Sequence, residues 1–156
     1  MRVFLNPNVD PLGAGYTIIQ SKIAIGSGRF LGKGWLSGTQ GQLSFLPERH
    51  TDFIFAVIGE EMGFLGVIVL ILLFYLLIYF GLRIAAQTKD RFGSLMALGI
   101  VITIAYQAVI NIAMTIGICP VVGLVLPFIS YGGSSLVIFA ILMGILININ
   151  KRRIIF

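Results

Sequence analysis

The residues best suited to chemistry gather in one short segment, Leu46–Glu61, LPERHTDFIFAVIGEE. It holds four of the chain's six carboxylates together with an arginine and the only histidine: Glu48, Arg49, His50, Asp52, Glu60 and Glu61. The segment runs directly into an uncharged stretch of membrane length. Charges in such a place are costly unless they lie at the membrane interface or line a polar cavity. The pattern indicates either a functional site or an ordinary polar cap at the beginning of a helix.

Other kinds of site are poorly supported. The single cysteine, Cys119, excludes an internal disulfide, and one distant histidine leaves no zinc constellation. The stretch Gly28–Gly34, GRFLGKG, is one residue short of a Walker A motif and ends in glycine rather than serine or threonine. The nearby Gly26-x-Gly28 lacks the third glycine of a dinucleotide fingerprint. We therefore predict no nucleotide site. No cofactor is evident, and a divalent-cation requirement stays open.

The glycine-rich stretch still carries two cations, Arg29 and Lys33. It is either a solvated loop or a flexible backbone that approaches an anionic lipid head group. The shorter run Ile18–Ile25 is amphipathic and too short to cross a bilayer, so we expect a helix lying at the interface. The rest of Met1–Phe45 is rich in turn residues and is predicted not to span.

Composition makes this an integral membrane protein. The chain is 58% hydrophobic and 11% charged, with a mean hydropathy of +1.02. Met62–Leu82 has no charge and is long enough to span. Gly93–Asn150 is also uncharged but is too long for one helix and is interrupted by prolines and glycines. We divide it into spans at about Leu95–Ile118 and Ser134–Asn150, joined by a broken connection over Pro120–Ser135. The predicted fold is all-α with three transmembrane helices.

Lysines and arginines orient these spans. The loop after the first span and the C-terminal tail carry six cations, which we expect to be cytoplasmic: Arg83, Lys89, Arg91, Lys151, Arg152 and Arg153. Residues 1–61 have balanced charge and are predicted to form an extracellular loop, with residues 62–156 as the three-span region. The net charge of +5 is thus explained without a nucleic acid. Residues 1–61 contain no signal peptide that could export them. We therefore expect transmembrane helices upstream, so that this is the C-terminal part of a larger protein.

Polar residues within the second span also indicate that this helix packs against other helices or a cavity. Gln107 and Asn111 are four residues apart on one helical face, which should turn inward, away from lipid. Structural hydrogen bonds and substrate contact are both open roles for them. The broken backbone of Pro120–Ser135 must be buried in protein or line water.

Two long motifs identify a resemblance. The first combines Asn111, Gly117, Pro120 and Gly123 with the run Phe128–Ser135, FISYGGSS, and the second is Leu46–Phe55, LPERHTDFIF. Together they resemble the SEDS family of bacterial glycosyltransferases, which polymerise peptidoglycan from lipid II. Residues 20–28 and 32–35, with Gly38-Thr39-Gln40 and PERH, resemble the RodA-like elongation branch more than the FtsW division branch. The chain has valine at position 125, where members of the family commonly have proline.

The resemblance implies the C-terminal part of a bundle of about ten spans of ~20 residues each. It implies that Asp52 is the catalytic carboxylate, because a carboxylate near a sugar hydroxyl can accept its proton during glycan extension. The leaving pyrophosphate needs cations or amides. We expect substrate-binding roles for eight residues: Lys22, Arg29, Lys33, Glu48, Arg49, His50, Thr51 and Ser130. We also expect Thr51 to cap a helix beginning near Asp52.

The same resemblance places the protein in the bacterial cytoplasmic membrane, with lipid II as substrate and a class B penicillin-binding protein as partner. The competing functions are a flippase for a lipid-linked precursor and a non-catalytic scaffold of the cell-wall machinery. The requirement for Asp52 separates them, because only the polymerase needs this carboxylate for bond formation. We expect the 156-residue chain to be inactive when made without the helices that build the rest of the cavity.

Overall fold

The computed structural model describes residues 14–34 and 51–155, and in these ranges the regular structure is entirely helical. The described helices are α2 (Ala14–Ser27), α4 (Ile54–Glu61), α5 (Gly63–Gln87), α6 (Arg91–Ile116) and α7 (Gly133–Ile155). Helices α5, α6 and α7 are each long and apolar enough to cross a membrane. The prediction of an all-α protein with three membrane spans is thereby confirmed.

The spans begin and end close to their predicted limits, with differences that have local causes. Helix α6 begins at Arg91 rather than near Leu95, because the Asp90 carboxylate accepts hydrogen bonds from the backbone N–H groups of Phe92 and Gly93. It ends at Gly117, which has the left-handed φ of +78° that favours glycine. The predicted break over Pro120–Ser135 is confirmed as the irregular connection 117–132 between α6 and α7.

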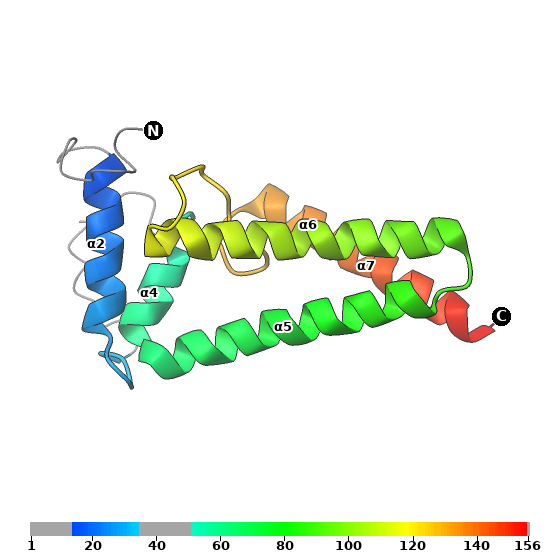
Figure 1. Ribbon diagram of the computed structural model, residues 1–156, viewed down its shortest axis with the longest axis horizontal. Coiled ribbons are helices and arrows are strands. Elements are labelled where there is room, and N and C mark those ends of the chain that lie inside the picture. The colour runs from blue at the N-terminus through cyan, green and yellow to red at the C-terminus, as the bar shows by residue number, and fades with distance from the viewer. Residues whose placement is uncertain (1–13, 35–50, 156) are drawn as a thin grey trace.

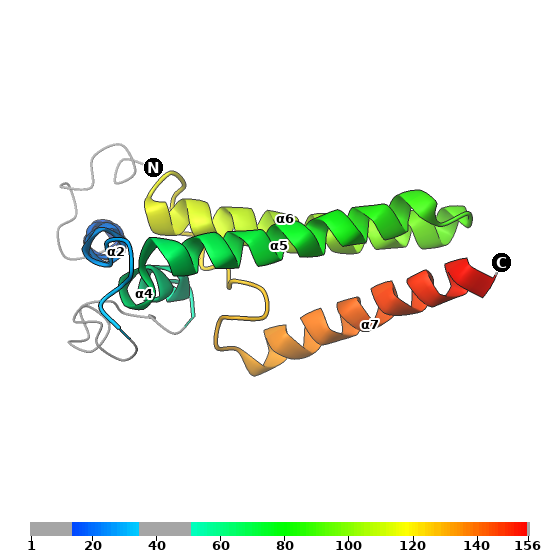
Figure 2. The ribbon, with the colours of Figure 1, turned by 90° about the horizontal axis from the view of Figure 1, so that it is seen from below.

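Helices α5 and α6 form an antiparallel pair joined by a short turn (Figure 1). Gly81 of α5 lets Val101 of α6 come close, since a Cβ at Gly81 would overlap the valine side chain. Helix α7 is inclined to this pair and lies farthest from it at its N-terminal end (Figure 2). Only 11% of the membrane-length apolar stretch of α7 is buried, against 33% of that of α6. Most of the surface of α7 therefore faces lipid or other protein.

Helix α2 lies across the end of the α5–α6 pair, and the short α4 connects it to α5 (Figures 1 and 2). The 14 residues of α2 are too few to span a bilayer, as expected for the segment around Ile18–Ile25. Two glycines allow α2 to pack on α4 through backbone contact. A Cβ at Gly28 would overlap the carbonyl oxygen of Gly59, and one at Gly32, whose φ is +77°, would overlap that of Glu61.

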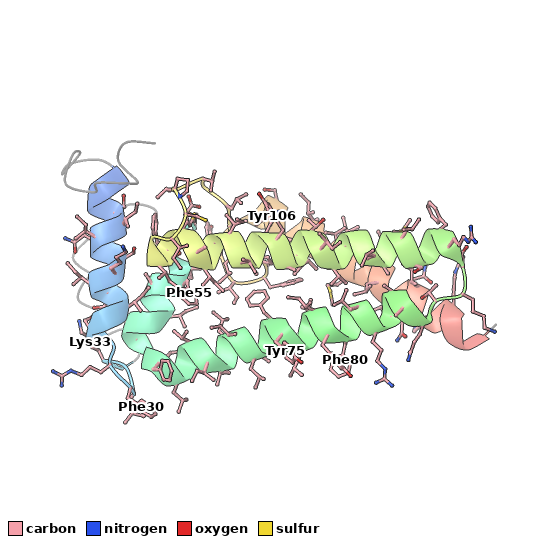
Figure 3. The ribbon with its side chains drawn as sticks, viewed as in Figure 1. Phe30, Lys33, Phe55, Tyr75, Phe80 and Tyr106 are labelled. Atoms are coloured by element: carbon pink, nitrogen blue, oxygen red, sulfur yellow. The ribbon has the colours of Figure 1, made fainter. Side chains whose placement is uncertain are left out.

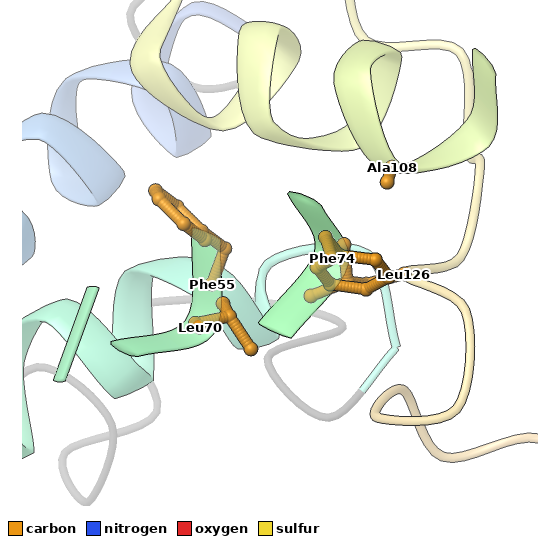
Figure 4. Packing of buried hydrophobic residues seen from close by; sticks show 5 residues of the cluster. All are labelled: Phe55, Leu70, Phe74, Ala108 and Leu126. Carbon is orange, nitrogen blue, oxygen red and sulfur yellow. The ribbon is translucent and has the colours of Figure 1, made fainter. Parts of the chain in front are cut away.

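An apolar cluster joins these elements to the spans. Phe55 of α4, Leu70 and Phe74 of α5, Ala108 of α6 and Leu126 of the 117–132 connection pack together (Figure 4). Fully burying a large apolar side chain stabilises by about 1.5–3 kcal/mol where the alternative is water. This cluster anchors both α4 and the 117–132 connection to the same end of the bundle.

Candidate functional site

Asp52 lies immediately before α4, at the end of the bundle where α2, α4 and the 117–132 connection meet (Figure 1). It is 7% exposed, and its neighbour Phe53 packs with Ala24 of α2 and Ala56 of α4. The carboxylate faces Gly123 of the connection, where a Cβ would stand 3.5 Å from Asp52 Oδ2. Gly123 has a φ of +68° and presents bare backbone to the carboxylate. Segments far apart in the sequence thus enclose Asp52.

Two side chains from other elements hold the backbone at Asp52. Asn111 of α6 donates from Nδ2 to the Asp52 carbonyl oxygen at 3.0 Å and to the Leu124 carbonyl oxygen at 2.6 Å. Ser130 Oγ donates to the Thr51 carbonyl oxygen at 2.6 Å and accepts from the Leu126 N–H at 2.7 Å. Asn111 therefore links the backbone of Asp52 to the 117–132 connection, and Ser130, which belongs to this connection, links it to the backbone of Thr51. Asn111 is fully buried and Ser130 nearly so, which strengthens these bonds.

The expected capping role of Thr51 is wrong. Helix α4 begins at Ile54, its N-cap is Phe53, and no side chain in the described part of the chain caps it. The turn of residues 51–53 places Thr51 before the cap position. Thr51 instead contributes its carbonyl oxygen, which accepts the hydrogen bond from Ser130.

Lys22 lies on α2 against the end of α6. A Cβ at Gly117 would come within 2.8 Å of Lys22 Nζ, so the ammonium sits beside the C-cap of α6. A cation is favourable there, because the C-terminus of a helix carries a partial negative charge. Ser21 fixes this docking by donating from Oγ to the Thr115 carbonyl oxygen at 2.8 Å. Thr115 Oγ1 in turn donates to the Asn111 carbonyl oxygen at 2.7 Å. A hydrogen-bonded chain therefore connects α2 to Asn111.

Lys33 and Arg29 lie at the other end of α4. Lys33 Nζ pairs with Glu60 Oε1 at 2.8 Å, and Glu60 is fully buried. Since α4 has eight residues, Asp52 and the Lys33–Glu60 pair are separated along the helix by roughly 12 Å. Arg29 is exposed and has a φ of +50°. Both cations line a cavity of about 690 Å³ together with Ile23, Gly26, Ser27, Gly28 and Gly32.

The predicted site residues thus fall into two groups. Asp52, Thr51, Ser130 and Lys22 lie around the end of α6, whereas Arg29 and Lys33 lie around the end of α4. Glu48, Arg49 and His50 lie outside the described residues. Within the described ranges, no group of three or more histidine, cysteine, aspartate or glutamate side chains could hold a metal ion.

Sequence patterns missed how Asn111 is used. Asn111 was predicted to face inward, but its hydrogen bond to the backbone carbonyl oxygen of Asp52 could not be seen, because the two positions are 59 residues apart. Its Oδ1 is buried without a hydrogen-bond partner among the described residues, as is Gln107 Oε1 one helical turn earlier. Polar residues inside an apolar span were the signal for this position.

The geometry can support proton transfer. The carboxylate of Asp52 is not used to cap α4, and its backbone is held on two sides. A carboxylate fixed in this way can accept a proton from a substrate hydroxyl within hydrogen-bond reach. Lys22 places a positive charge beside the 117–132 connection, which forms part of the same enclosure.

Relatives place this arrangement in a family. Residues 1–154 match the model of the FtsW, RodA and SpoVE cell cycle proteins. The chain is 55% identical to the peptidoglycan glycosyltransferase MrdB of Escherichia coli strain K12 over 97% of its length, which is 41% of that relative. It is 53% identical to the probable peptidoglycan glycosyltransferase FtsW of Trichlorobacter lovleyi and 47% identical to stage V sporulation protein E of Bacillus subtilis.

A solved structure has the same fold. It is described as "Structural coordination of polymerization and crosslinking by a peptidoglycan synthase complex", and it matches 97% of this chain with a TM-score of 0.77 and 34% identity. The match covers 40% of that structure's chain. The chain spans about two fifths of the length of the relatives it matches. The family match and the shared helical arrangement agree: the chain belongs to the FtsW/RodA/SpoVE family of cell cycle proteins.

Proposed function

We propose that this chain supplies the Asp52 site of a RodA-like peptidoglycan glycosyltransferase that polymerises lipid II into glycan strands for cell-wall elongation. The observation that carries the proposal is the placement of Asp52. Its carboxylate lies beside Gly123, and its backbone is held by Asn111 while Ser130 holds the preceding residue. The names of the relatives, which are peptidoglycan glycosyltransferases, support the same activity.

In the proposed reaction, a hydroxyl of one sugar attacks the anomeric carbon of another sugar that carries a lipid pyrophosphate. A glycosidic C–O bond forms, and the bond between the anomeric carbon and the pyrophosphate oxygen breaks. Asp52 accepts the hydroxyl proton, and the lipid pyrophosphate leaves with the electron pair. No covalent sugar–enzyme intermediate is required.

The leaving pyrophosphate gains negative charge and needs nearby cations. Lys22 is the described cation that packs beside the 117–132 connection, so we assign it to this role. Arg29 and Lys33 lie near the opposite end of α4 and would contact a part of the lipid precursor farther from the reacting atoms. Glu48, Arg49 and His50 precede Asp52 directly in the sequence and remain proposed substrate contacts.

The setting of the reaction follows from the substrate. We place residues 1–61 on the outer side of the bacterial cytoplasmic membrane, because lipid II is polymerised there. The described parts of this segment lie at the same end of the bundle as the 117–132 connection (Figure 1). A class B penicillin-binding protein is the proposed partner. The similarity to a structure from a complex of polymerisation and crosslinking supports it.

The test is Asp52→Asn in the full-length protein, assayed for polymerisation of purified lipid II in detergent or liposomes. The amide keeps the size of the side chain but cannot act as a base, so we expect a rate loss of about 10²–10⁴-fold. Glu61→Gln is the matched control. It also removes one negative charge without changing size, at the far end of α4, and should retain most activity.

Thermal unfolding of both variants checks that the fold is kept. A folded Asp52→Asn protein within about tenfold of the wild-type rate would rule out Asp52 as the general base. It would favour a transporter or a scaffold.

A further inference from the structure

A second feature lies at the end of α4 away from Asp52. The turn that follows α2, residues 29–33, exposes two large apolar side chains to the surroundings: Phe30 is 65% exposed and Leu31 is 76% exposed. Arg29 precedes them and Lys33 follows them after Gly32. We call residues 29–33 the interfacial turn. Exposed apolar groups rimmed by charged residues mark a surface that contacts something other than water.

The depth of this turn in the membrane is set by α5, a membrane span whose first turn it contacts. The N–H of Phe64 donates to the Arg29 carbonyl oxygen at 3.0 Å, and the N–H of Leu65 donates to that of Phe30 at 3.3 Å. The rings of Phe30 and Phe64 are in contact, with centroids 5.9 Å apart. The interfacial turn is thus hydrogen-bonded to the first turn of a span and lies level with it. Figure 3 shows Phe30 beside this end of α5, on the side away from α6.

The turn also joins an exposed apolar patch on the neighbouring helix ends. Met62, Phe64 and Leu65 are 48%, 54% and 52% exposed. The patch lies where a helix enters the membrane, which is the level of lipid phosphates and the upper acyl chains. Aromatic rings with flanking cations are typical of this level.

We propose that the interfacial turn inserts into the bilayer leaflet at the α2 end of the bundle, with Phe30 and Leu31 against acyl chains and Arg29 at lipid phosphates. A leaflet supplies apolar chains and anionic phosphates at one depth, so it fits both parts of the turn. A transmembrane helix of another protein would cover the apolar side chains but would have to supply an acidic group for Arg29. The proposal does not depend on the glycosyltransferase activity, and it gives Arg29 a bilayer phosphate in place of the contact with the lipid precursor.

The insertion has a structural consequence for α4. The turn is tied to the end of α4 by the Lys33–Glu60 pair, by the bond from the Lys33 N–H to the Glu60 carbonyl oxygen at 3.0 Å, and by the bond from the Gly34 N–H to the Glu61 carbonyl oxygen at 3.1 Å. Asp52 lies at the other end of this rigid helix. The depth of the turn in the leaflet therefore sets the height of Asp52 above the membrane.

The test is collisional accessibility of a nitroxide label in the full-length protein, reconstituted in vesicles of phosphatidylethanolamine and phosphatidylglycerol. Labels are attached to Phe30→Cys and, separately, Leu31→Cys in a background without other reactive cysteines. Lys89→Cys is the aqueous reference, because position 89 is exposed in the charged turn between α5 and α6, far from the interfacial turn. Leu72→Cys, 51% exposed within α5, is the membrane reference.

Oxygen concentrates in lipid, whereas a water-soluble nickel chelate is excluded from it. We expect both turn positions to collide often with oxygen and rarely with nickel, as at position 72. Nickel collisions as frequent as at position 89 would show that the turn is in water and would overturn the proposal. Rare collisions with both reagents would also overturn it, because they would show that protein covers the turn. Two label sites keep the test informative if one variant does not fold.

Discussion

Two aspartates at opposite ends of the bundle illustrate two ways of holding a carboxylate. Both stand just before a helix. Asp90 accepts hydrogen bonds from the N–H groups of Phe92 at 3.3 Å and Gly93 at 3.0 Å, so its oxygens complete the first turn of α6. Asp52 precedes α4, which no side chain caps. Its backbone is instead held by Asn111, 59 residues away.

The difference separates a structural role from the catalytic role that we propose for Asp52. A carboxylate that caps a helix has its lone pairs occupied by backbone donors and stabilises its own turn. A carboxylate whose backbone is held by other side chains keeps its position without using its own oxygens as a cap. Asp52 can therefore meet a substrate, whereas Asp90 has a local partner already. Substitutions at the two ends of the bundle should differ accordingly.

The strongest way to break the comparison is to push the turn that follows α2 away from the C-terminal end of α4, the helix that Asp52 precedes. Gly32→Ala places a Cβ on the carbonyl oxygen of Glu61 at a φ of +77°. A left-handed conformation costs a residue with a side chain about 1–3 kcal/mol, and the overlap adds to it. We expect a marked drop in thermal stability and the loss of polymerase activity.

Gly26→Ala is the matched control, since a Cβ at position 26 meets nothing within 4 Å. Alanine favours a helix over glycine by about 0.5–1 kcal/mol. Stability should therefore stay level or rise slightly. Equal losses from the two substitutions would show that the close approach of α2 and α4 is unimportant.

A smaller effect should follow from releasing the backbone at Asp52. Asn111→Ala removes hydrogen bonds to the buried carbonyl oxygen of Asp52 and the partly buried one of Leu124, and Ser130→Ala removes one that it donates and one that it accepts. Each unsatisfied buried group costs about 1–3 kcal/mol. We expect lower unfolding temperatures and polymerisation slowed by about 10–100-fold, because a displaced base transfers protons less efficiently.

Thr103→Ala is the control for this pair. Thr103 donates only to the Gly99 carbonyl oxygen one turn earlier and is exposed. Its loss should change neither stability nor rate appreciably. Wild-type rates in both Asn111→Ala and Ser130→Ala would show that the backbone at Asp52 does not need these supports.

The ion pair at the far end of α4 should matter for stability more than for catalysis. Lys33→Met leaves the Glu60 carboxylate, which is fully buried, without this cation. Removing one partner of a buried pair costs up to about 3–5 kcal/mol, less here because the Lys33 side chain is 30% exposed. The double variant Lys33→Met with Glu60→Gln should recover part of the loss, measured as a double-mutant cycle of unfolding free energies. Additive losses would contradict a direct coupling.

The smallest effect should come from the other aspartate. Asp90→Ala removes the N-cap of α6 and should cost about 1 kcal/mol of stability, while Asp90→Asn, an equally good cap, should cost little. Neither should change the polymerisation rate, since the residue lies at the end of the bundle opposite Asp52 (Figure 1). A rate loss in Asp90→Asn as large as that in Asp52→Asn would remove the distinction between the two carboxylates.

Much of the fold could be predicted because it depends on local patterns. Uncharged stretches of membrane length identified all three spans, and prolines and glycines identified the 117–132 break. Hydropathy and backbone breakers act over neighbouring residues, so they can be read without knowing what lies nearby. Asp52 was also singled out from its sequence motif, and its catalytic role stays a prediction. The N-cap near it was not identified, because Thr51 is a good capping residue by type but precedes the cap position.

Only the tertiary structure decided how the site is held. The contacts of Asn111 with Asp52, of Ser130 with Thr51, and of Lys33 with Glu60 join residues 59, 79 and 27 positions apart. No local preference specifies such pairs. They form because the apolar cluster around Phe55 and the glycine contacts between α2 and α4 bring separate segments to one end of the bundle, where buried polar groups must find partners. The sequence by itself determined which segments span and which carboxylate is singled out. Packing determined what surrounds that carboxylate.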